Sequence, residues 1–438
     1  MSGPNPRAAA VAALVRQEQD GFSNLILDAE LRRQKLEGRD KAFASAIFYT
    51  VLEHQGTLDY ILSQFLPKGL ARLDPQVREI LRAALAQARY MQVPASAAVN
   101  EAVKLTRAFR KASASGLVNA VLRRAIGYDL GSAVFADEVE RLMVLGSAGR
   151  DVAAFLHEHY PDEALDILTH TADGGLTSLR ANPLKGTPEA LCEKLLASGA
   201  KTAAPGLVPG SVLARFEGSP AESGLFRDGY FHVEGQASQL AALCVEAKPG
   251  DTVLDLCAAP GGKSFSAAFA MEDKGEIVSC DLHENKLKRI QEGAARLDLT
   301  SITTSAGDGR VFRPEWAERF DTVLVDAPCS GLGIIRKKPD VRYKKADDLF
   351  TLPVIQTALL DNAAKYVAPG GVLVYSTCTI LPEENEQVTD TFLAEHSEFC
   401  REGFTLPEPV GETEGQLTLW PQRHGTDGFY ICRMTRRP

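Results

Sequence analysis

The stretch "FDTVLVDAPCSG", residues 320–331, begins as an apolar run and ends in two reactive side chains. A short run of mostly apolar and β-branched residues is typical of a buried β-strand. Asp326 and Cys329 follow this run, so both side chains are expected where the strand ends. Ligands of open α/β sheets bind at that edge, and a carboxylate and a thiol three residues apart there predict a functional site.

Other apolar runs from residue 236 onward alternate with helical patterns such as residues 284–297. The predicted strands are residues 252–257, 276–281, 302–308, 321–326 and 371–377. Apolar strands joined by helical crossovers predict a parallel sheet covered on both faces, which is the doubly wound, Rossmann-like α/β fold. The carboxyl edge of this sheet should gather Cys257, Asp281, Asp308, Asp326 and Cys378.

The first strand-to-helix turn, "CAAPGGK" at residues 257–263, fits neither the P-loop pattern nor the dinucleotide-binding G-x-G-x-x-G pattern. Gly261 and Gly262 still permit a tight turn whose bare backbone approaches a ligand. Asp281 lies 20 residues after Gly261, where an acidic group accepts hydrogen bonds from ribose hydroxyls. Asp308 ends the next strand and could face an adenine amino group. This set predicts a nucleoside without phosphates, and therefore S-adenosylmethionine rather than NAD.

The thiols of Cys329 and Cys378 follow strands that should be neighbours in such a sheet. Cytosine C5 becomes nucleophilic only after a thiolate has attacked C6, and an adjacent carboxyl group such as Asp326 can polarise N3. One thiol would attack and the other would help to break the adduct, and the residues alone leave open which does which. The alternative is that both are inert packing cysteines, as we expect for the others in the chain.

The 438-residue chain is long enough for two or three domains. Residues 1–128 carry 18 Lys and Arg against 11 Asp and Glu, whereas the whole chain has a net charge of −9. This basic excess suggests that an all-α domain at residues 1–135 meets a polyanion, although a solvated helical surface would look the same. Residues 136–235 read as an α+β connector, and residues 236–438 as the catalytic domain. Scattered cysteines and the lack of an 18-residue apolar run favour a reducing cytoplasm, without structural zinc or a membrane.

"CAAPGGK", "DAPCSGLG" and "YSTCTILPEENE" together resemble the signature segments of the NOL1/NOP2/Sun family of RNA 5-methylcytosine methyltransferases. The resemblance implies that Cys378 is the nucleophile and that Cys329 assists product release. We hypothesise in addition that Lys263 reaches the cytosine or its backbone. The cofactor site implied by the family is made of Cys257, Ala258, Ala259, Pro260, Gly261, Gly262, Lys263, Asp281, Asp308 and Asp326.

The N-terminal stretches at residues 39–66 and 113–125 resemble a NusB-like RNA-binding domain. Together with the connector, they make nearly the whole chain similar to the bacterial RsmB (Sun/Fmu) group of 16S rRNA methyltransferases. One departure is visible, because Glu234-Gly235 stands where the family often has Gln-Asp.

A basic segment, "RKKPDVRYKK" at residues 336–345, follows the Pro-Cys motif and could hold phosphates around the target base. Its candidate RNA-binding residues are Arg336, Lys337, Lys338, Arg342, Lys344 and Lys345. The expected protein is a cytoplasmic, metal-free monomer that methylates C5 of an unpaired or extruded cytosine in 16S rRNA, through a covalent cysteine–C6 adduct. The alternatives are the same chemistry on tRNA or another rRNA site, and a non-catalytic NusB-like RNA-binding factor.

Overall fold

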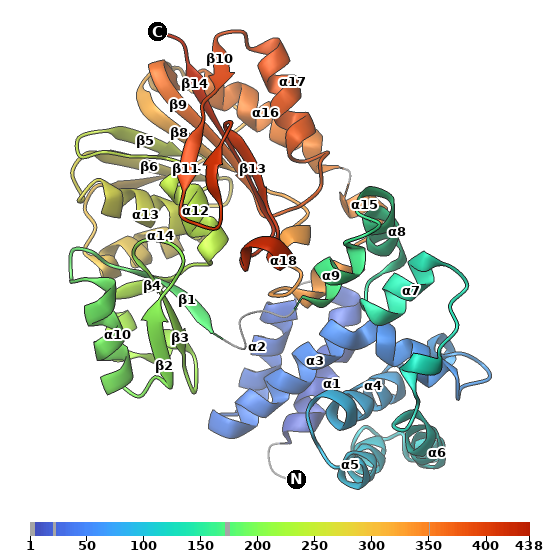
Figure 1. Cartoon of the computed structure of the whole chain (residues 1–438). Coiled ribbons are helices and arrows are strands. Elements are labelled where there is room, and N and C mark those ends of the chain that lie inside the picture. Colours follow the sequence, from blue (N-terminus) through green and yellow to red (C-terminus); the bar gives the residue numbers. More distant parts are fainter. Residues whose placement is uncertain (1–4, 21–22, 171–175, 350) are drawn as a thin grey trace. The chain divides into compact units, whose positions relative to one another are not determined.

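The computed structural model describes residues 5–20, 23–170, 176–349 and 351–438, and it divides into two compact units (Figure 1). The helical unit comprises Met1–Thr169 and Ile335–Ala346. The sheet unit comprises His170–Ile334 and Asp347–Pro438. No helix of the described ranges is both long and apolar enough to cross a lipid bilayer.

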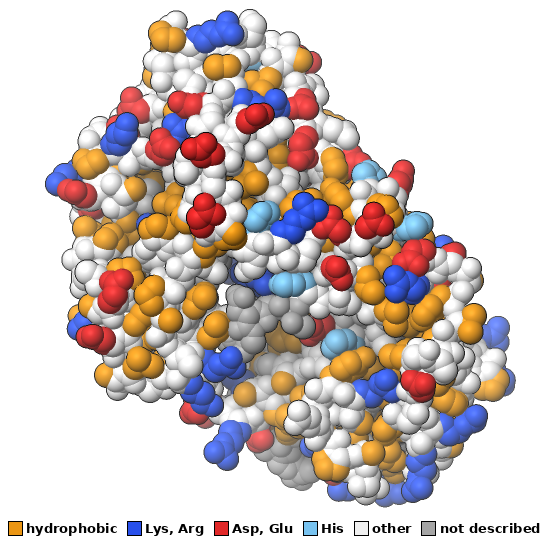
Figure 2. All heavy atoms as spheres, in the orientation of Figure 1, with side chains coloured by type: hydrophobic (Ala, Val, Ile, Leu, Met, Phe, Trp, Pro, Cys, Tyr) orange, Lys and Arg blue, Asp and Glu red, His pale blue; other side chains and the backbone are white. Residues whose placement is uncertain are grey.

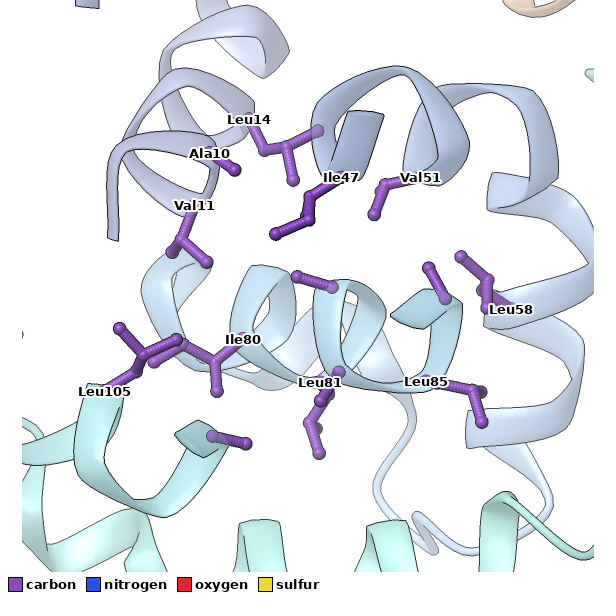
Figure 3. Packing of buried hydrophobic residues seen from close by; sticks show 14 of the residues in the cluster. Ala10, Val11, Leu14, Ile47, Val51, Leu58, Ile80, Leu81, Leu85 and Leu105 are labelled. Carbon is purple, nitrogen blue, oxygen red and sulfur yellow. The ribbon is translucent and has the colours of Figure 1, made fainter. Parts of the chain in front are cut away.

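The helical unit contains an apolar core formed by side chains between Ala9 and Ala125. Its helices are α1 (Pro6–Asp20), α2 (Ser23–Arg33), α3 (Gly38–Ser63), α4 (Pro75–Tyr90), α5 (Ala95–Ala108), α6 (Ser115–Ala125), α7 (Glu138–Leu145), α8 (Arg150–His159) and α9 (Ala164–Thr169). Figure 3 shows Leu14 of α1 and Ile47 of α3 pointing toward one another on one side of α4, whereas Leu81 of α4 points to the other side of that helix. The start of α4 follows from its sequence, because the Asp74 carboxylate caps the Gln76 N–H and proline occupies the first helical position.

The boundary of the helical unit differs from the one predicted at residue 135. Helices α7 to α9 extend the unit to Thr169, because the buried Leu142 and Val144 of α7 belong to an apolar face and α7 contacts α3. The Thr57 hydroxyl donates a hydrogen bond of 2.5 Å to the Val144 carbonyl and ties these two helices together. The predicted α+β connector is therefore α+β only in its second half.

That second half forms a small antiparallel sheet at the start of the sheet unit. Its elements are β1 (Thr177–Ala181), α10 (Pro188–Ala197), β2 (Thr202–Pro205), β3 (Ser211–Arg215), α11 (Gly224–Arg227) and β4 (Phe231–Val233). The strand order is β2-β3-β1-β4. Buried Leu179, Leu191, Val212 and Phe231 pack α10 against the sheet.

The main sheet has the order β10-β14-β9-β8-β5-β6-β7, and β13 pairs with β14. Its strands are β5 (Thr252–Asp255), β6 (Glu276–Asp281), β7 (Ile302–Ala306), β8 (Phe320–Asp326), β9 (Val367–Thr377), β10 (Phe399–Arg401), β13 (Gln416–Leu419) and β14 (Phe429–Arg436). The five strands predicted from the sequence pair with one another in parallel, which confirms that part of the prediction. The sequence did not predict β14, which runs antiparallel to β9, or its partners β10 and β13.

Helices cover both faces of this sheet, as expected for a doubly wound fold (Figure 1). They are α12 (Gln236–Leu243), α13 (Gly262–Ala270) and α14 (Glu284–Leu297) on one face, and α16 (Leu352–Ala364) and α17 (Glu386–Glu395) on the other. Side chains of β8 alternate accordingly, because Leu324 joins the core under the first group and Val323 and Val325 join the core under the second.

Candidate active site

The two thiols predicted to act together lie side by side. Cys329 follows β8 and Cys378 follows β9, and these strands are parallel neighbours with Asp326 paired to Ser376. The two Sγ atoms are 3.1 Å apart, and the Cys378 N–H donates a hydrogen bond of 3.2 Å to the Cys329 sulfur. Both residues are half-buried, so a ligand at the sheet edge can reach them.

The loops that carry the thiols are hydrogen-bonded to each other. The hydroxyls of Ser330 and Thr379 are 2.7 Å apart, and the Gly333 N–H donates to the Cys378 carbonyl at 3.0 Å. Gly333 is needed for this close approach, because a Cβ at that position would lie 1.9 Å from the Gly428 carbonyl oxygen. The sulfur–sulfur contact is therefore held by main-chain geometry on both sides.

Glu384 supports the Pro-Cys loop from below, a role that was not predicted. Its carboxylate is fully buried and accepts hydrogen bonds from the Ser330 N–H at 2.9 Å and from Gln356 Nε2 at 2.8 Å. The only signal in the sequence was that Glu384 stands six residues after Cys378, in the segment "YSTCTILPEENE". Burying an acid costs free energy unless it is hydrogen-bonded. The hydrogen bonds of Glu384 therefore hold both its carboxylate and the Pro-Cys loop in place.

The environment of Cys329 keeps its thiol protonated. The hydrogen bond with Cys378 and the burial of the group raise the pKa of Cys329 well above that of a free cysteine. A neutral thiol at rest is a poor nucleophile, whereas its thiolate, once formed, is a strong base.

Asp326 is held by an ion pair with Lys263. The Lys263 Nζ lies 2.6 Å from Asp326 Oδ2, and the Ser376 hydroxyl donates to Asp326 Oδ1 at 2.9 Å. Lys263 is 6% exposed and its ammonium sits 5.0 Å from the ring centroid of Phe429. Burial opposes its charge, but the carboxylates of Asp326 and Glu234 outweigh burial and raise the pKa of Lys263. The lysine is therefore charged and lies against the carboxylate beside the thiols.

The glycine turn before α13 leaves main-chain groups open to a ligand. Gly261 has φ of +109°, a conformation that favours glycine, and a Cβ there would lie 2.6 Å from the Phe265 ring. Gly261 is also the N-cap residue of α13, and it has no side chain that could accept a hydrogen bond from the first N–H groups of this helix. Such a helix terminus attracts the negative end of a ligand.

The buried side chain of Glu234 lies against this turn. Its buried carboxylate accepts hydrogen bonds from His232 at 3.0 Å and from the hydroxyls of Ser238 and Ser266, both at 2.8 Å. A Cβ on Gly262 would lie 3.0 Å from Glu234 Oε1. Burial opposes ionisation, but hydrogen bonding and charge from His232 prevail and lower the pKa of Glu234 to about 2. An ionised acid therefore lies against the glycine turn.

Asp281 and Asp308, the two acids predicted to bind a nucleoside, differ in their burial and in their hydrogen-bond partners. Asp281 is buried, and its Oδ1 accepts the His283 N–H at 3.0 Å. Leu282 beside it is 56% exposed and offers apolar surface. Asp308 differs from expectation, because Arg310 binds both of its oxygens, at 2.9 and 2.6 Å, and so occupies part of its acceptor capacity.

These residues fit S-adenosylmethionine. The uncapped start of α13 suits its carboxylate, Asp281 suits its ribose hydroxyls, and Leu282 suits its adenine. The sequence reasoning missed Asp255, which lies fully buried at the end of β5 and accepts the Ser264 hydroxyl at 2.7 Å. Burial raises the pKa of Asp255 to about 7.

The basic segment belongs to the helical unit, which corrects the expectation for Arg342. Its guanidinium is buried and donates to the carbonyls of Gly146 and Leu168, at 2.7 and 2.9 Å, so it cannot contact a phosphate. Charge alone predicted an exposed residue, whereas the carbonyls at two helix ends bind the guanidinium instead. Lys337, Lys338 and Lys345 are exposed, and Arg336 and Lys344 are half-buried.

Comparison with known proteins identifies the family. The model for "16S rRNA methyltransferase RsmB/F" matches residues 242–435, and the NusB family model matches residues 4–127. A probable ribosomal RNA small subunit methyltransferase B of Bacillus subtilis is 35% identical over all of both chains, and the Pseudomonas putida enzyme of that name is 32% identical over 99% of this chain and 98% of its own length.

Solved structures agree with this assignment. The crystal structure of PH0851 has a TM-score of 0.81 and 27% identity, and covers 99% of each chain. A methyltransferase homologue from Pyrococcus horikoshii has a TM-score of 0.59 and 25% identity over 69% of this chain and all of its own. The chain therefore belongs to the 16S rRNA methyltransferase RsmB/F family and is an S-adenosylmethionine-dependent RNA methyltransferase.

Proposed function

We propose that this protein methylates C5 of a cytosine in 16S rRNA through a temporary bond between the Cys378 sulfur and cytosine C6. One observation carries the proposal: two sulfur atoms 3.1 Å apart lie on loops that follow adjacent strands, and the first of these loops begins at the Lys263–Asp326 ion pair. The names of the small subunit rRNA methyltransferases that it resembles support the choice of RNA. A ribosomal RNA substrate implies action in the cytoplasm, which the free cysteines also favour.

The first half of the reaction activates the ring. The Cys378 thiolate adds to C6, and the Lys263–Asp326 pair supplies the proton that N3 needs, so C5 becomes an enamine carbon. Lys263 can take this role because it is charged and lies 2.6 Å from the carboxylate. Bound S-adenosylmethionine supplies an electrophilic methyl group to this carbon.

The second half of the reaction releases the product. After methyl transfer the C5 hydrogen must leave as a proton, and the bond between C6 and the Cys378 sulfur must break. Cys329, whose raised pKa keeps it protonated, can pass its proton to the adjoining Cys378 sulfur as the bond from that sulfur to C6 breaks, and the Cys329 thiolate so formed takes the C5 proton. Cys329 is therefore assigned to product release and Cys378 to attack.

The target base must be accessible to both thiols. A stacked, paired cytosine hides C5 and C6, so the substrate is single-stranded or extruded at this position. Exposed Lys337, Lys338 and Lys345 are proposed to contact the RNA backbone.

Methyl transfer tests the proposal directly. The protein is incubated with methyl-labelled cofactor and with 16S rRNA, 23S rRNA or tRNA from cells that lack it, and the RNA is digested to nucleosides. We expect labelled 5-methylcytidine only from 16S rRNA, at a position that bisulfite sequencing then identifies. If tRNA or 23S rRNA were labelled instead, that RNA would be the substrate. If no RNA were labelled, the protein would be a non-catalytic RNA-binding factor.

A further inference from the structure

The basic excess of the N-terminal third is concentrated in one part of the helical unit. Residues 91–128, which contain α5 and α6, carry six Lys and Arg and a single acid, Glu101. Residues 1–90 carry twelve Lys and Arg against ten Asp and Glu, which is nearly neutral. Figure 2 shows blue side chains gathered along the part of the helical unit formed by α5 and α6. A solvated surface would mix both signs, so this imbalance marks a surface for an anionic partner.

The same two helices enclose a groove. One hollow of about 350 Å³ lies between the start of α5 and the end of α6, and another of about 500 Å³ adjoins it. Asn100 lines both hollows, and the two together are called the α5–α6 groove below. Its polar lining comes from Ser96, Asn100, Lys104, Ser115, Asn119 and Arg123.

Four of the six polar lining side chains have partners, because Lys104 pairs with Glu101, Ser115 with Thr106, and Arg123 with Asn119. The other two remain available to a ligand. Within the described residues, the side chains of Ser96 and Asn100 have no hydrogen-bond partner, and both are exposed. Arg107 and Arg110, which follow in α5 and the turn after it, are exposed and make no ion pair with a described residue. Amides, hydroxyls and guanidinium groups together match phosphate oxygens and ribose hydroxyls.

We propose that the α5–α6 groove binds the sugar–phosphate backbone of the RNA substrate. The proposal rests on the proposed function, because it names the surface that engages the same RNA. The groove lining favours RNA over DNA, since the Ser96 hydroxyl and the Asn100 amide can bind the 2′-hydroxyl that only RNA carries. Because residues 91–128 contain only one acid against six Lys and Arg, the electrostatic potential along both helices is positive.

Gly116→Glu is the most direct test of this surface. Gly116 lines the groove in the first turn of α6, and a Cβ added there would meet no atom within 4 Å. An acid in the first turn of a helix is favourable, so the variant should fold. Lys41→Glu is the matched control, because Lys41 is exposed in the first turn of α3, outside the groove. It lowers the net charge by two units, whereas Gly116→Glu lowers it by one, so a general effect of charge would be larger in the control.

Binding is measured without cofactor, using labelled 16S rRNA, and a short RNA duplex beside a DNA duplex of the same sequence. G116E should weaken RNA binding about tenfold at low salt, and R123Q should lower the salt dependence by about one phosphate contact. K41E should bind like the wild-type protein, and RNA should bind more tightly than DNA. The proposal would be overturned if G116E bound RNA as tightly as the wild-type protein does, which is the result expected if the groove holds a protein instead. It would also be overturned if K41E lost as much RNA affinity as G116E, or if the protein bound the DNA duplex as tightly as the RNA duplex. Methyl transfer is measured separately, so failure of the proposed function would not be mistaken for failure of the groove.

Discussion

The Sγ atoms of Cys329 and Cys378 lie 3.1 Å apart although 49 residues separate them in the chain. The contact follows from the parallel pairing of β8 and β9, which brings the ends of both strands to one edge. Three further features fix the two loops: the Ser330–Thr379 hydroxyl pair, the Gly333 N–H and the Glu384 carboxylate. The pair of thiols is therefore a property of the sheet topology and not of flexible loops.

Replacement of Lys263 by methionine should separate ring activation from cofactor binding. K263M keeps the buried stem but removes the ammonium 2.6 Å from Asp326. The rate of methyl transfer at saturating cofactor should fall on the order of a hundredfold, as for loss of a positioned proton donor. The dissociation constant for S-adenosylmethionine, measured by calorimetry, should change much less.

Lys274→Met is the control for this variant, because Lys274 is exposed and pairs only with exposed Glu272 among the described residues. Its rate and its cofactor affinity should match those of the wild-type protein. If K263M lost cofactor affinity as strongly as it lost rate, Lys263 would belong to the cofactor site alone.

Arg342 should act on stability, unlike its exposed neighbours. R342M leaves the Gly146 and Leu168 carbonyls without their charged donor, so the helical unit should lose about 1–3 kcal/mol. Hydrogen exchange followed by mass spectrometry should show faster exchange in α7 and α9. K338M, at an exposed position four residues earlier, should exchange as the wild-type protein does. Normal protection in R342M would mean that the buried guanidinium contributes nothing.

Asp255 predicts a pH dependence of stability in the sheet unit. Burial raises its folded pKa from 3.8 to about 7, so the unfolded state releases its proton first as pH rises. Its contribution is fully present below about pH 4, is lost between pH 4 and 7, and changes no further above that range. The slope is at most about 1.4 kcal/mol per pH unit.

The D255N variant cannot ionise and should lack this loss. Urea unfolding can be followed by tryptophan fluorescence, because Trp316 and Trp420 are the only tryptophans and both lie in the sheet unit. The stability of the wild-type protein relative to D255N should fall as pH rises from 4 to 7. Parallel curves would show that Asp255 is ionised or exposed in the folded state.

Much of the sheet unit could be predicted because its signals are local. The apolar run at residues 276–281 and the amphipathic pattern at residues 284–297 became β6 and α14 with the predicted bounds. Strand β14 was missed because it joins the sheet by antiparallel pairing with β9, which no alternation of strand and helix announces. The sequence also has no local pattern that would show that residues 335–346 belong to the helical unit, because they lie far along the chain from its helices.

The site was predictable where chemistry follows strand ends and was not where partners are distant. Strand position placed Cys329, Cys378 and Asp326 together at one edge. The burial of Arg342 depends on carbonyls 174 and 196 residues away, so its charge misled the prediction. Glu384 similarly needed the fold to reveal that it supports the Pro-Cys loop.

The covalent step is tested most directly by trapping the protein on its RNA. C329A should accumulate an adduct with 16S rRNA that survives denaturing electrophoresis, because attack by Cys378 proceeds while release fails. C378A should form no adduct and transfer no methyl group. An adduct in C378A, or full methyl transfer by both variants, would contradict the assignment of attack to Cys378 and release to Cys329.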